Sequence, residues 1–348
     1  MLFGLLLLLF VLCLYRVRID IKGFHDDYMS KAKTDAIRGI FIMLVVYKHA
    51  MGYLNDLGYE FEALGDNVFA SLFNCLGQLL VVMFLFYSGY GIGESYKKKG
   101  ETYLQGYPRK RILTTLLNFD VAVIAFVILA LLIGRPVTMS QSLLSLTGWE
   151  NVGNSNWYIF VILCCYALAW VVLRLPLASR AYRATLLFAL CLVLLYILYC
   201  YKDGYWFDTL LTFPAGFLFS TYKKGIERFV KRRYWGVLAV LALLFLVQFY
   251  GHYNGCYFDR LNLTYNAFSI TFALLVVVLT MKVGINNQPL QWLGSNLFPI
   301  YIYMRIPMII LVETQPEFVL AQPAAFVVIS LAATLLIAGL YRYWRIRL

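Results

Sequence analysis

Long apolar runs alternate with short polar connections along the whole chain. Several of these runs lie near the lower limit of about 17 residues for a helix that crosses a bilayer. Because backbone hydrogen bonds must be satisfied internally in lipid, the pattern predicts an all-α fold, a polytopic transmembrane helix bundle of about ten or eleven spans. The candidate spans are residues 2–15, 37–55, 67–92, 112–133, 157–173, 184–200, 207–222, 235–250, 265–281, 292–313 and 324–341.

The composition agrees with this pattern. Hydrophobic residues make up 62% of the 348 residues and charged residues 14%, whereas an average soluble domain is about 25% charged. No stretch of the sequence is long and polar enough to form a soluble domain. The chain is therefore expected to act in or beside the bilayer, as an integral multi-pass protein.

The basic residues predict the orientation of the chain in the membrane. With residues 16–36 in the cytoplasm, alternation of the spans places 25 of the 30 Lys and Arg residues on the cytoplasmic side. This asymmetry follows the positive-inside rule. It predicts an outer N-terminus and a cytoplasmic C-terminus, and it accounts for the net charge of +12 without a nucleic-acid partner.

The first apolar run divides the chain into two predicted parts. It lacks a preceding basic region and a small-residue cleavage site, so we interpret it as an uncleaved anchor and not as a signal peptide. Residues 1–30 are then an N-terminal membrane anchor with its cytoplasmic connection, and residues 31–348 form the main membrane domain.

Two ionisable residues on the apolar stretch 37–54, together with one just before it, are the strongest candidates for chemistry. Arg38 and His49 are eleven residues apart, which on a helix corresponds to about 1100° and a rise of about 16 Å, so they share one face. Asp35 falls within about 40° of His49 by the same count. His49 is either a general base or nucleophile, or a histidine hydrogen-bonded between helices. Arg38 is a phosphate contact or a membrane-edge anchor, and Asp35 is a helix cap or a partner that orients Arg38.

Further polar residues stand near this stretch or in other spans. Lys48 points about 100° away from His49, toward a neighbouring helix or a polar cavity. Ser88 precedes glycines at 89, 91 and 93, which permit either close helix packing or a broken helix that lines a cavity. The seven cysteines lie mostly inside apolar runs and are interpreted as packing residues, and no metal site is predicted.

Arg305 lies in the run WLGSNLFPIYIYMRIPMII, roughly 20 Å into the bilayer as counted from Trp292. A lone arginine at this depth requires a partner or a water-filled cavity. Asp120 and Glu313 are the candidate partners.

The two longest outer connections, at about 134–156 and 251–264, are rich in Asn, Gly and aromatic residues. Such loops can bind a sugar-like acceptor. The same composition is also typical of turns and of aromatic residues at the membrane interface, so both interpretations stay open.

The motifs together resemble the membrane acyltransferase-3 family, integral membrane O-acyltransferases of bacteria and eukaryotes. The Arg38 to His49 spacing, preceded by Asp35 in DAIRG, is similar to the family's Arg-x10-His signature. FLFYSG at 84–89 resembles its FFxxSG element and is followed by the basic loop YPRKRIL. NSNWYIF at 154–160 and LGSNLFPIYIYMRIP resemble two later helix starts, so the likeness spans about residues 31–313.

The chain departs from the family pattern at several positions. Leu85 replaces the second phenylalanine, and Thr114 replaces the second arginine of an Arg-x-x-Arg pair that begins at Arg111. Met304 and Arg305 stand where the family often carries a histidine after Ile-Tyr, and the N-terminal span is additional.

The resemblance implies an activity and a role for each candidate residue. It implies transfer of an acetyl group from cytoplasmic acetyl-coenzyme A, a donor substrate and not a permanently bound cofactor, to a hydroxyl of a polysaccharide or lipid-linked sugar. The protein would then lie in a bacterial inner membrane. The implied catalytic residues are His49, Arg38 and Asp35; the donor-binding residues are Arg38, Ser88, Arg109, Lys110 and Arg111; the acceptor-side residues are Lys48, Trp157, Tyr158 and Arg305.

Two other classes of protein compete with this interpretation. A transporter or flippase of lipid-linked sugars also needs many spans and intramembrane cations, but it predicts no thioester hydrolysis. A membrane sensor of an acyl or sugar ligand leaves Arg38 and His49 without a shared role.

Overall fold

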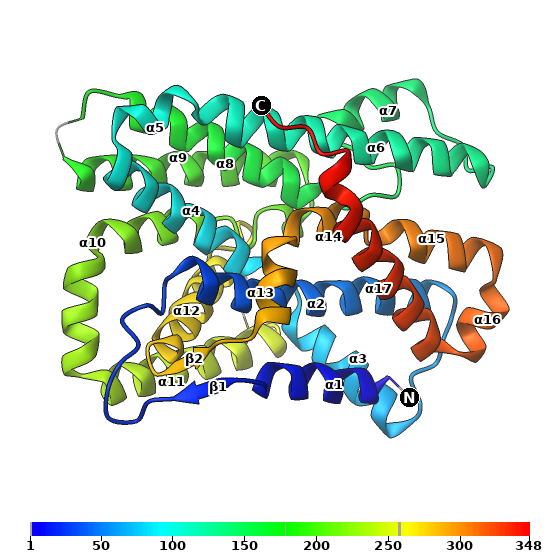
Figure 1. Ribbon diagram of the computed structural model, residues 1–348, viewed down its shortest axis with the longest axis horizontal. Coiled ribbons are helices and arrows are strands. Elements are labelled where there is room, and N and C mark those ends of the chain that lie inside the picture. The colour runs from blue at the N-terminus through cyan, green and yellow to red at the C-terminus, as the bar shows by residue number, and fades with distance from the viewer. Residues whose placement is uncertain (1, 178, 257–258) are drawn as a thin grey trace.

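The computed structural model describes residues 2–177, 179–256 and 259–348. Residues 257 and 258 of the predicted outer loop, and Met1 of the predicted anchor, lie outside this description. Within the described residues, nine helical segments are long and apolar enough to cross a membrane. Figure 1 shows most of them side by side in one bundle, which confirms the all-α, polytopic prediction.

The nine long segments account for most of the chain. They are α2 (Lys31–Asp56), α4 (Leu79–Lys99), α6 (Thr114–Leu132) with the preceding π-helical turn η1 (Pro108–Leu113), α8 (Trp157–Arg174), α9 (Arg180–Tyr201), α11 (Tyr234–Tyr253), α12 (Leu263–Thr280), α14 (Leu297–Tyr303) with α15 (Arg305–Thr314), and α17 (Pro323–Leu340) with the final turn η3 (Tyr341–Tyr343).

Shorter elements connect the long segments. They are α1 (Phe3–Leu14), α3 (Leu64–Leu76), α5 (Glu101–Gln105), α7 (Met139–Leu146), η2 (Gly204–Trp206), α10 (Thr212–Arg232), α13 (Gln288–Ser295) and α16 (Pro316–Ala321).

Two of the eleven predicted spans do not reach the length or apolarity of the other nine. Helix α1 has 12 residues, about 18 Å, whereas the hydrocarbon core is about 30 Å thick. Helix α10 begins at Thr212 and not at residue 207, and its second half is strongly basic. Its buried residues lie mostly in its first half, so this helix enters the bundle without forming a long apolar segment.

A short antiparallel ribbon ties the N-terminal segment to the bundle. Strand β1 (Val17–Ile19) pairs with β2 (Val283–Ile285), and Arg18 lies opposite Gly284. Beside it, the Lys282 ammonium donates hydrogen bonds to the carbonyl oxygens of Asp20, Ile21 and Gly23, at 3.2, 2.6 and 2.9 Å. The chain between α1 and α2 is therefore held against the connection between α12 and α13.

Small residues bring α4 and α10 into backbone contact. A Cβ added to Gly89 would overlap the carbonyl of Phe213, and one added to Gly216 would overlap the carbonyl of Phe86. Gly93 is packed against the Ser220 side chain in the same way. This is the close approach that small residues permit between membrane helices. The packing interpretation is confirmed for Gly89 and Gly93, whereas Gly91 faces open space, and α4 is continuous through all three.

The same kind of contact joins α2 and α13. Gly39 lies against the backbone of Leu290, and Gly294 lies against the backbone of Asp35. The N-terminal half of α2, which carries Asp35 and Arg38, is therefore fixed by backbone contact.

Two prolines set the breaks between α13, α14 and α15. Helix α13 ends at Ser295, four residues before Pro299, and α14 ends at Tyr303, four residues before Pro307. Because proline has no backbone N–H, the carbonyl four residues earlier loses its helical hydrogen bond. Arg305 consequently begins a new helical segment beside the second break.

Replacement of Gly89 by alanine is expected to lower the thermal unfolding temperature in detergent. The new methyl group has to displace the Phe213 carbonyl, and overpacking of this kind costs roughly 1–3 kcal/mol. Gly91→Ala on the same helix is the matched control, because no atom lies within 4 Å of its added Cβ. An equal loss in both variants, measured by differential scanning fluorimetry, would contradict the proposed contact.

Candidate active site

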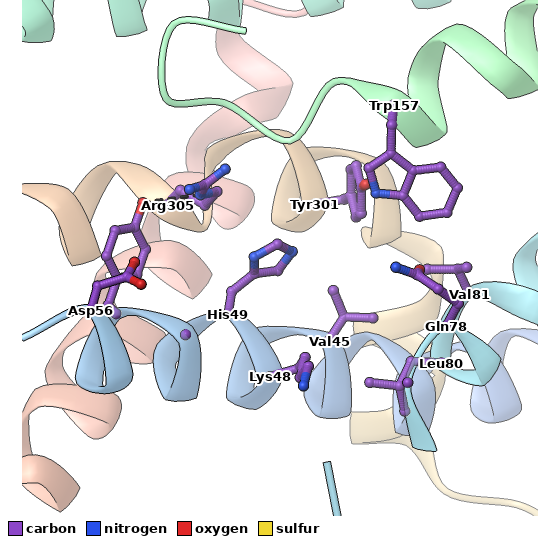
Figure 2. A pocket seen from close by; sticks show the side chains of 13 residues that line it. Val45, Lys48, His49, Asp56, Gln78, Leu80, Val81, Trp157, Tyr301 and Arg305 are labelled. Atoms are coloured by element: carbon purple, nitrogen blue, oxygen red, sulfur yellow. Dashed lines mark hydrogen bonds between the residues drawn. The ribbon is translucent and has the colours of Figure 1, made fainter. Parts of the chain in front are cut away.

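A cavity of about 430 Å³ opens beside the C-terminal half of α2; we call it the His49 cavity. Figure 2 shows that the His49 imidazole projects from α2 into this space, with Arg305 and Tyr301 opposite. The lining residues are Val45, Lys48, His49, Gly52, Tyr53 and Asp56 from α2, Gly77 and Gln78 from the turn between α3 and α4, Leu80 and Val81 from α4, Trp157 from α8, Tyr301 from α14 and Arg305 from α15.

The His49 ring makes no hydrogen bond to any described residue. It therefore lacks the interhelical hydrogen bond that would give it a purely structural role, and its nitrogens face the cavity (Figure 2). A free imidazole at the wall of a cavity is suited to proton transfer or to nucleophilic attack.

Arg305 is held by neutral groups. Its Nε donates a hydrogen bond to the Tyr53 hydroxyl at 3.0 Å, and its guanidinium lies 5.3 Å from the centroid of the same ring. A second guanidinium nitrogen, Nη1, donates to the Asn154 carbonyl oxygen at 3.3 Å. Since none of these partners carries a charge, the guanidinium presents a positive charge to the cavity.

The predicted carboxylate partners of Arg305 are wrong. Glu313 instead pairs with Arg135. Asp120 Oδ1 is buried without a hydrogen-bond partner among the described residues. Arg305 instead contacts Tyr53 and Asn154, which are distant in the sequence, and the sequence spacing alone does not reveal such partners.

The Tyr301 hydroxyl is a second unsatisfied group in this cavity. It is buried and has no hydrogen-bond partner within the part of the chain that the structure describes. A buried polar group without a partner is uncommon and requires an explanation. Because this oxygen is fully buried, it is the Tyr301 ring and not its hydroxyl that lines the open space of the cavity.

Lys48 lies at the cavity wall on the side of α3. Its ammonium is 3.5 Å from Asn74 Oδ1, at the long limit of a hydrogen bond. Both predicted surroundings, a neighbouring helix and a polar cavity, are therefore present at this residue.

Asp35 and Arg38 form a separate charged cluster nearer the start of α2. The buried Asp35 carboxylate accepts hydrogen bonds from Arg38 at 3.2 Å and from Lys31 at 2.5 Å. The Arg38 guanidinium lies 5.5 Å from the centroid of the Tyr87 ring. Ser30, and not Asp35, caps the helix, because its side chain accepts from the Lys33 N–H. Asp35 therefore orients Arg38.

The charged cluster and the His49 cavity are not one open space in this structure. Arg38 does not line the cavity, which extends along α2 only as far as Val45. Ile42, one turn closer to Arg38, is fully buried. The structure thus brings His49 together with Lys48, Trp157 and Arg305, and it places Arg38 beyond a packed side chain.

The other predicted site residues lie outside this cavity. Tyr158 is buried behind Tyr301, with ring centroids 5.3 Å apart. Ser88 is half-buried on α4. The predicted donor-binding residues Arg109, Lys110 and Arg111 are exposed on the π-helical turn η1. Their assignments to donor or acceptor binding stay predictions.

A separate groove lined by basic side chains lies between α4, α9 and α10; we call it the basic groove. It measures about 910 Å³ and is lined by Lys97, Arg180, Lys223 and Lys224, among other residues. At its edge the Lys223 ammonium donates to the Tyr90 hydroxyl at 2.9 Å. This groove could not be predicted from the sequence, because its residues come from three helices that are far apart along the chain.

Several residues of the His49 cavity were not among those predicted from the sequence. Tyr53 and Asp56 follow His49 by four and seven residues, the spacing of one helix face, so that signal was present. Gln78 follows Gly77, whose positive φ of 47° ends α3. No spacing rule indicates that this turn brings the Gln78 side chain to the cavity.

Comparisons with known proteins agree with the geometry. A family model described as an acyltransferase domain matches residues 32–343, nearly the whole chain. Searches of curated proteins and of solved structures return no match. Among the described residues, no group of three or more His, Cys, Asp or Glu side chains could hold a metal ion.

Proposed function

Since the chain belongs to the acyltransferase-3 family and is a multi-pass membrane acyltransferase, we propose that it transfers an acetyl group from acetyl-coenzyme A to a hydroxyl of a polysaccharide or lipid-linked sugar. The observation that carries this proposal is the free His49 imidazole facing the Arg305 cation across the cavity.

In one route His49 acts as a general base. It takes the proton from the acceptor hydroxyl while that oxygen forms its bond to the thioester carbonyl carbon. The carbonyl oxygen becomes negatively charged, and the neighbouring Arg305 guanidinium stabilises it. The carbon–sulfur bond then breaks, and the coenzyme A thiolate receives the proton from His49.

In the second route His49 is itself the nucleophile. An imidazole nitrogen attacks the thioester carbon, the carbon–sulfur bond breaks, and the acetyl group stays on the ring while the ring N–H proton passes to the departing coenzyme A thiolate. The acceptor hydroxyl then attacks this acetyl-imidazole, and its proton returns to the His49 ring as the carbon–nitrogen bond breaks. Rapid-quench trapping with labelled acetyl-coenzyme A alone distinguishes the routes, because only the second yields a labelled enzyme.

The donor nucleotide is proposed to bind near the start of α2. Its phosphates are anionic, and Arg38, oriented by Asp35, presents a planar guanidinium suited to phosphate. Arg109, Lys110 and Arg111, Ser88, and the basic groove are further candidates on this side. Entry of the acyl arm from Arg38 to His49 requires the side chains around Ile42 to move.

The proposed location is a bacterial inner membrane with a cytoplasmic C-terminus. The acceptor then reaches His49 from the end of the cavity that lies away from Arg38, past Asp56 and Trp157. Lys48, Tyr158 and Arg305 complete the proposed acceptor side, with Tyr158 acting behind Tyr301.

His49→Ala is expected to lower acetyl transfer by about 10²–10⁴-fold, because the variant lacks the proposed base or nucleophile. The measurement is ester content of envelope polysaccharide in cells, together with acetyl-coenzyme A hydrolysis by purified protein. His252→Ala is the matched control, since this histidine packs against Tyr265 on α12 and does not line the cavity. Full esterification by a well-expressed His49→Ala protein would refute the proposal.

Arg38→Ala is expected to raise the KM for acetyl-coenzyme A by about tenfold, a loss of about 1.4 kcal/mol in binding the donor phosphates. Lys31→Ala provides the control, because Lys31 contacts the same Asp35 carboxylate but is mostly exposed. Steady-state kinetics at fixed acceptor concentration test the difference. Similar KM values for the two variants would exclude a donor-binding role for Arg38.

Gly52→Leu is expected to block binding of the acceptor without disturbing the fold. No atom lies within 4 Å of a Cβ added to Gly52, so the new side chain occupies free space at the cavity wall. We expect the KM for the acceptor to rise by about tenfold or more while the unfolding temperature is retained. Gly91→Leu is the control, because Gly91 also faces open space but does not line the cavity. Unchanged transfer by a folded Gly52→Leu protein would mean that the acceptor does not use this cavity.

A further inference from the structure

A second depression lies beside the His49 cavity, where α8 begins and α9 ends. It has a volume of about 470 Å³ and is lined mainly by aromatic and polar side chains; we call it the aromatic groove. The lining residues that matter below are Trp149, Glu150, Tyr201, Lys202, Asp203 and Tyr205.

The two spaces are separated by little more than one layer of side chains. Trp157 lines the His49 cavity, and Asn156, the residue before it, lines the aromatic groove. The Trp157 ring also meets the Tyr205 ring edge-on, with centroids 6.3 Å apart. The connection before α8, which carries Asn156, also contacts Arg305, because the Asn154 carbonyl oxygen accepts a hydrogen bond from the guanidinium.

The floor of the aromatic groove is built around the Lys202 side chain. The Lys202 ammonium lies 4.0 Å from the centroid of Trp149 and 4.7 Å from that of Trp206. It also donates to the Trp149 carbonyl oxygen at 2.8 Å and lies 3.5 Å from a Glu150 carboxylate oxygen. These contacts fix the rings before any ligand binds.

Other side chains of the groove are exposed and can contact a ligand. The Tyr201 side chain is 71% exposed and Tyr205 is 42% exposed. The Asp203 carboxylate is exposed and has no side-chain partner among the described residues. Aromatic residues that only anchor a protein at the membrane interface point toward lipid. Trp206, in contrast, is almost fully buried and packs against the Lys202 ammonium.

This combination matches the chemistry of a sugar ring. One face of a sugar ring carries C–H groups that pack on an aromatic ring, and its hydroxyl groups donate hydrogen bonds to carboxylates. We propose that the aromatic groove binds the sugar units next to the one that is acetylated. The acceptor of this enzyme is then an oligosaccharide chain, and not a single small metabolite.

This inference rests on the proposed function, since it needs a hydroxyl acceptor at His49. The groove and the cavity share the wall formed by Trp157 and Tyr205. One chain can therefore place a hydroxyl near His49 while its neighbouring units lie along Tyr201 and Asp203.

The test uses the Tyr201→Ala, Asp203→Asn double variant of the full-length protein in detergent. The probes are alkali-deacetylated envelope polysaccharide from the same cells, hydrolysed and separated into monosaccharides and longer fragments. We expect kcat/KM for the longer fragments to fall by about tenfold, while transfer to monosaccharides and hydrolysis of acetyl-coenzyme A stay unchanged.

Tyr182→Ala is the matched control, because Tyr182 lies on the same helix at its other end and is 70% exposed, nearly the same as Tyr201. A double variant that loses activity equally on short and long acceptors, or on neither, overturns the groove assignment. Failure of the proposed function has a different signature, namely that the wild-type protein transfers label to no fragment and hydrolyses no acetyl-coenzyme A.

Discussion

The backbone contact between α2 and α13 is the constraint on which the site depends. Gly39 and Gly294 let the two helices approach until their backbones touch. In lipid, where burial of apolar surface gives little driving force between helices, such close contact supplies much of the packing energy. Because α2 carries both the Asp35–Arg38 cluster and His49, this one contact fixes the position of both ends of the site.

The opposite wall of the site is built from interrupted helices. Pro299 and Pro307 remove hydrogen bonds that would keep α13, α14 and α15 in one straight rod. The breaks leave Tyr301 and Arg305 facing α2, where Tyr53 receives the guanidinium. The α2 wall is one regular helix, whereas the facing wall obtains its shape from broken ones.

Much of this arrangement could be predicted from the sequence, because it depends on local periodicity. The apolar runs located the nine long helices, and the spacing of Arg38 and His49 placed them on one face of α2. The partners of Arg305 could not be predicted, since they depend on how helices distant in sequence turn toward each other. The aromatic and basic grooves were missed for the same reason. The predicted span 2–15 is slightly longer than α1, and α10 begins five residues later than predicted and continues to Arg232, because an apolar run does not show where the helix that carries it begins and ends.

The buried Ile42 side chain determines how the membrane voltage would act on the proposed reaction. It closes the stretch of α2 between Arg38 and Val45, so an apolar layer separates the two polar regions. Moving a charge across such a layer changes its free energy by about 2.3 kcal/mol per unit charge for each 100 mV of transmembrane voltage. An acetyl group is neutral, whereas the nucleotide that delivers it is highly charged and stays on the Arg38 side in the proposed reaction. Acyl transfer past Ile42 would therefore move no net charge and proceed independently of the membrane voltage.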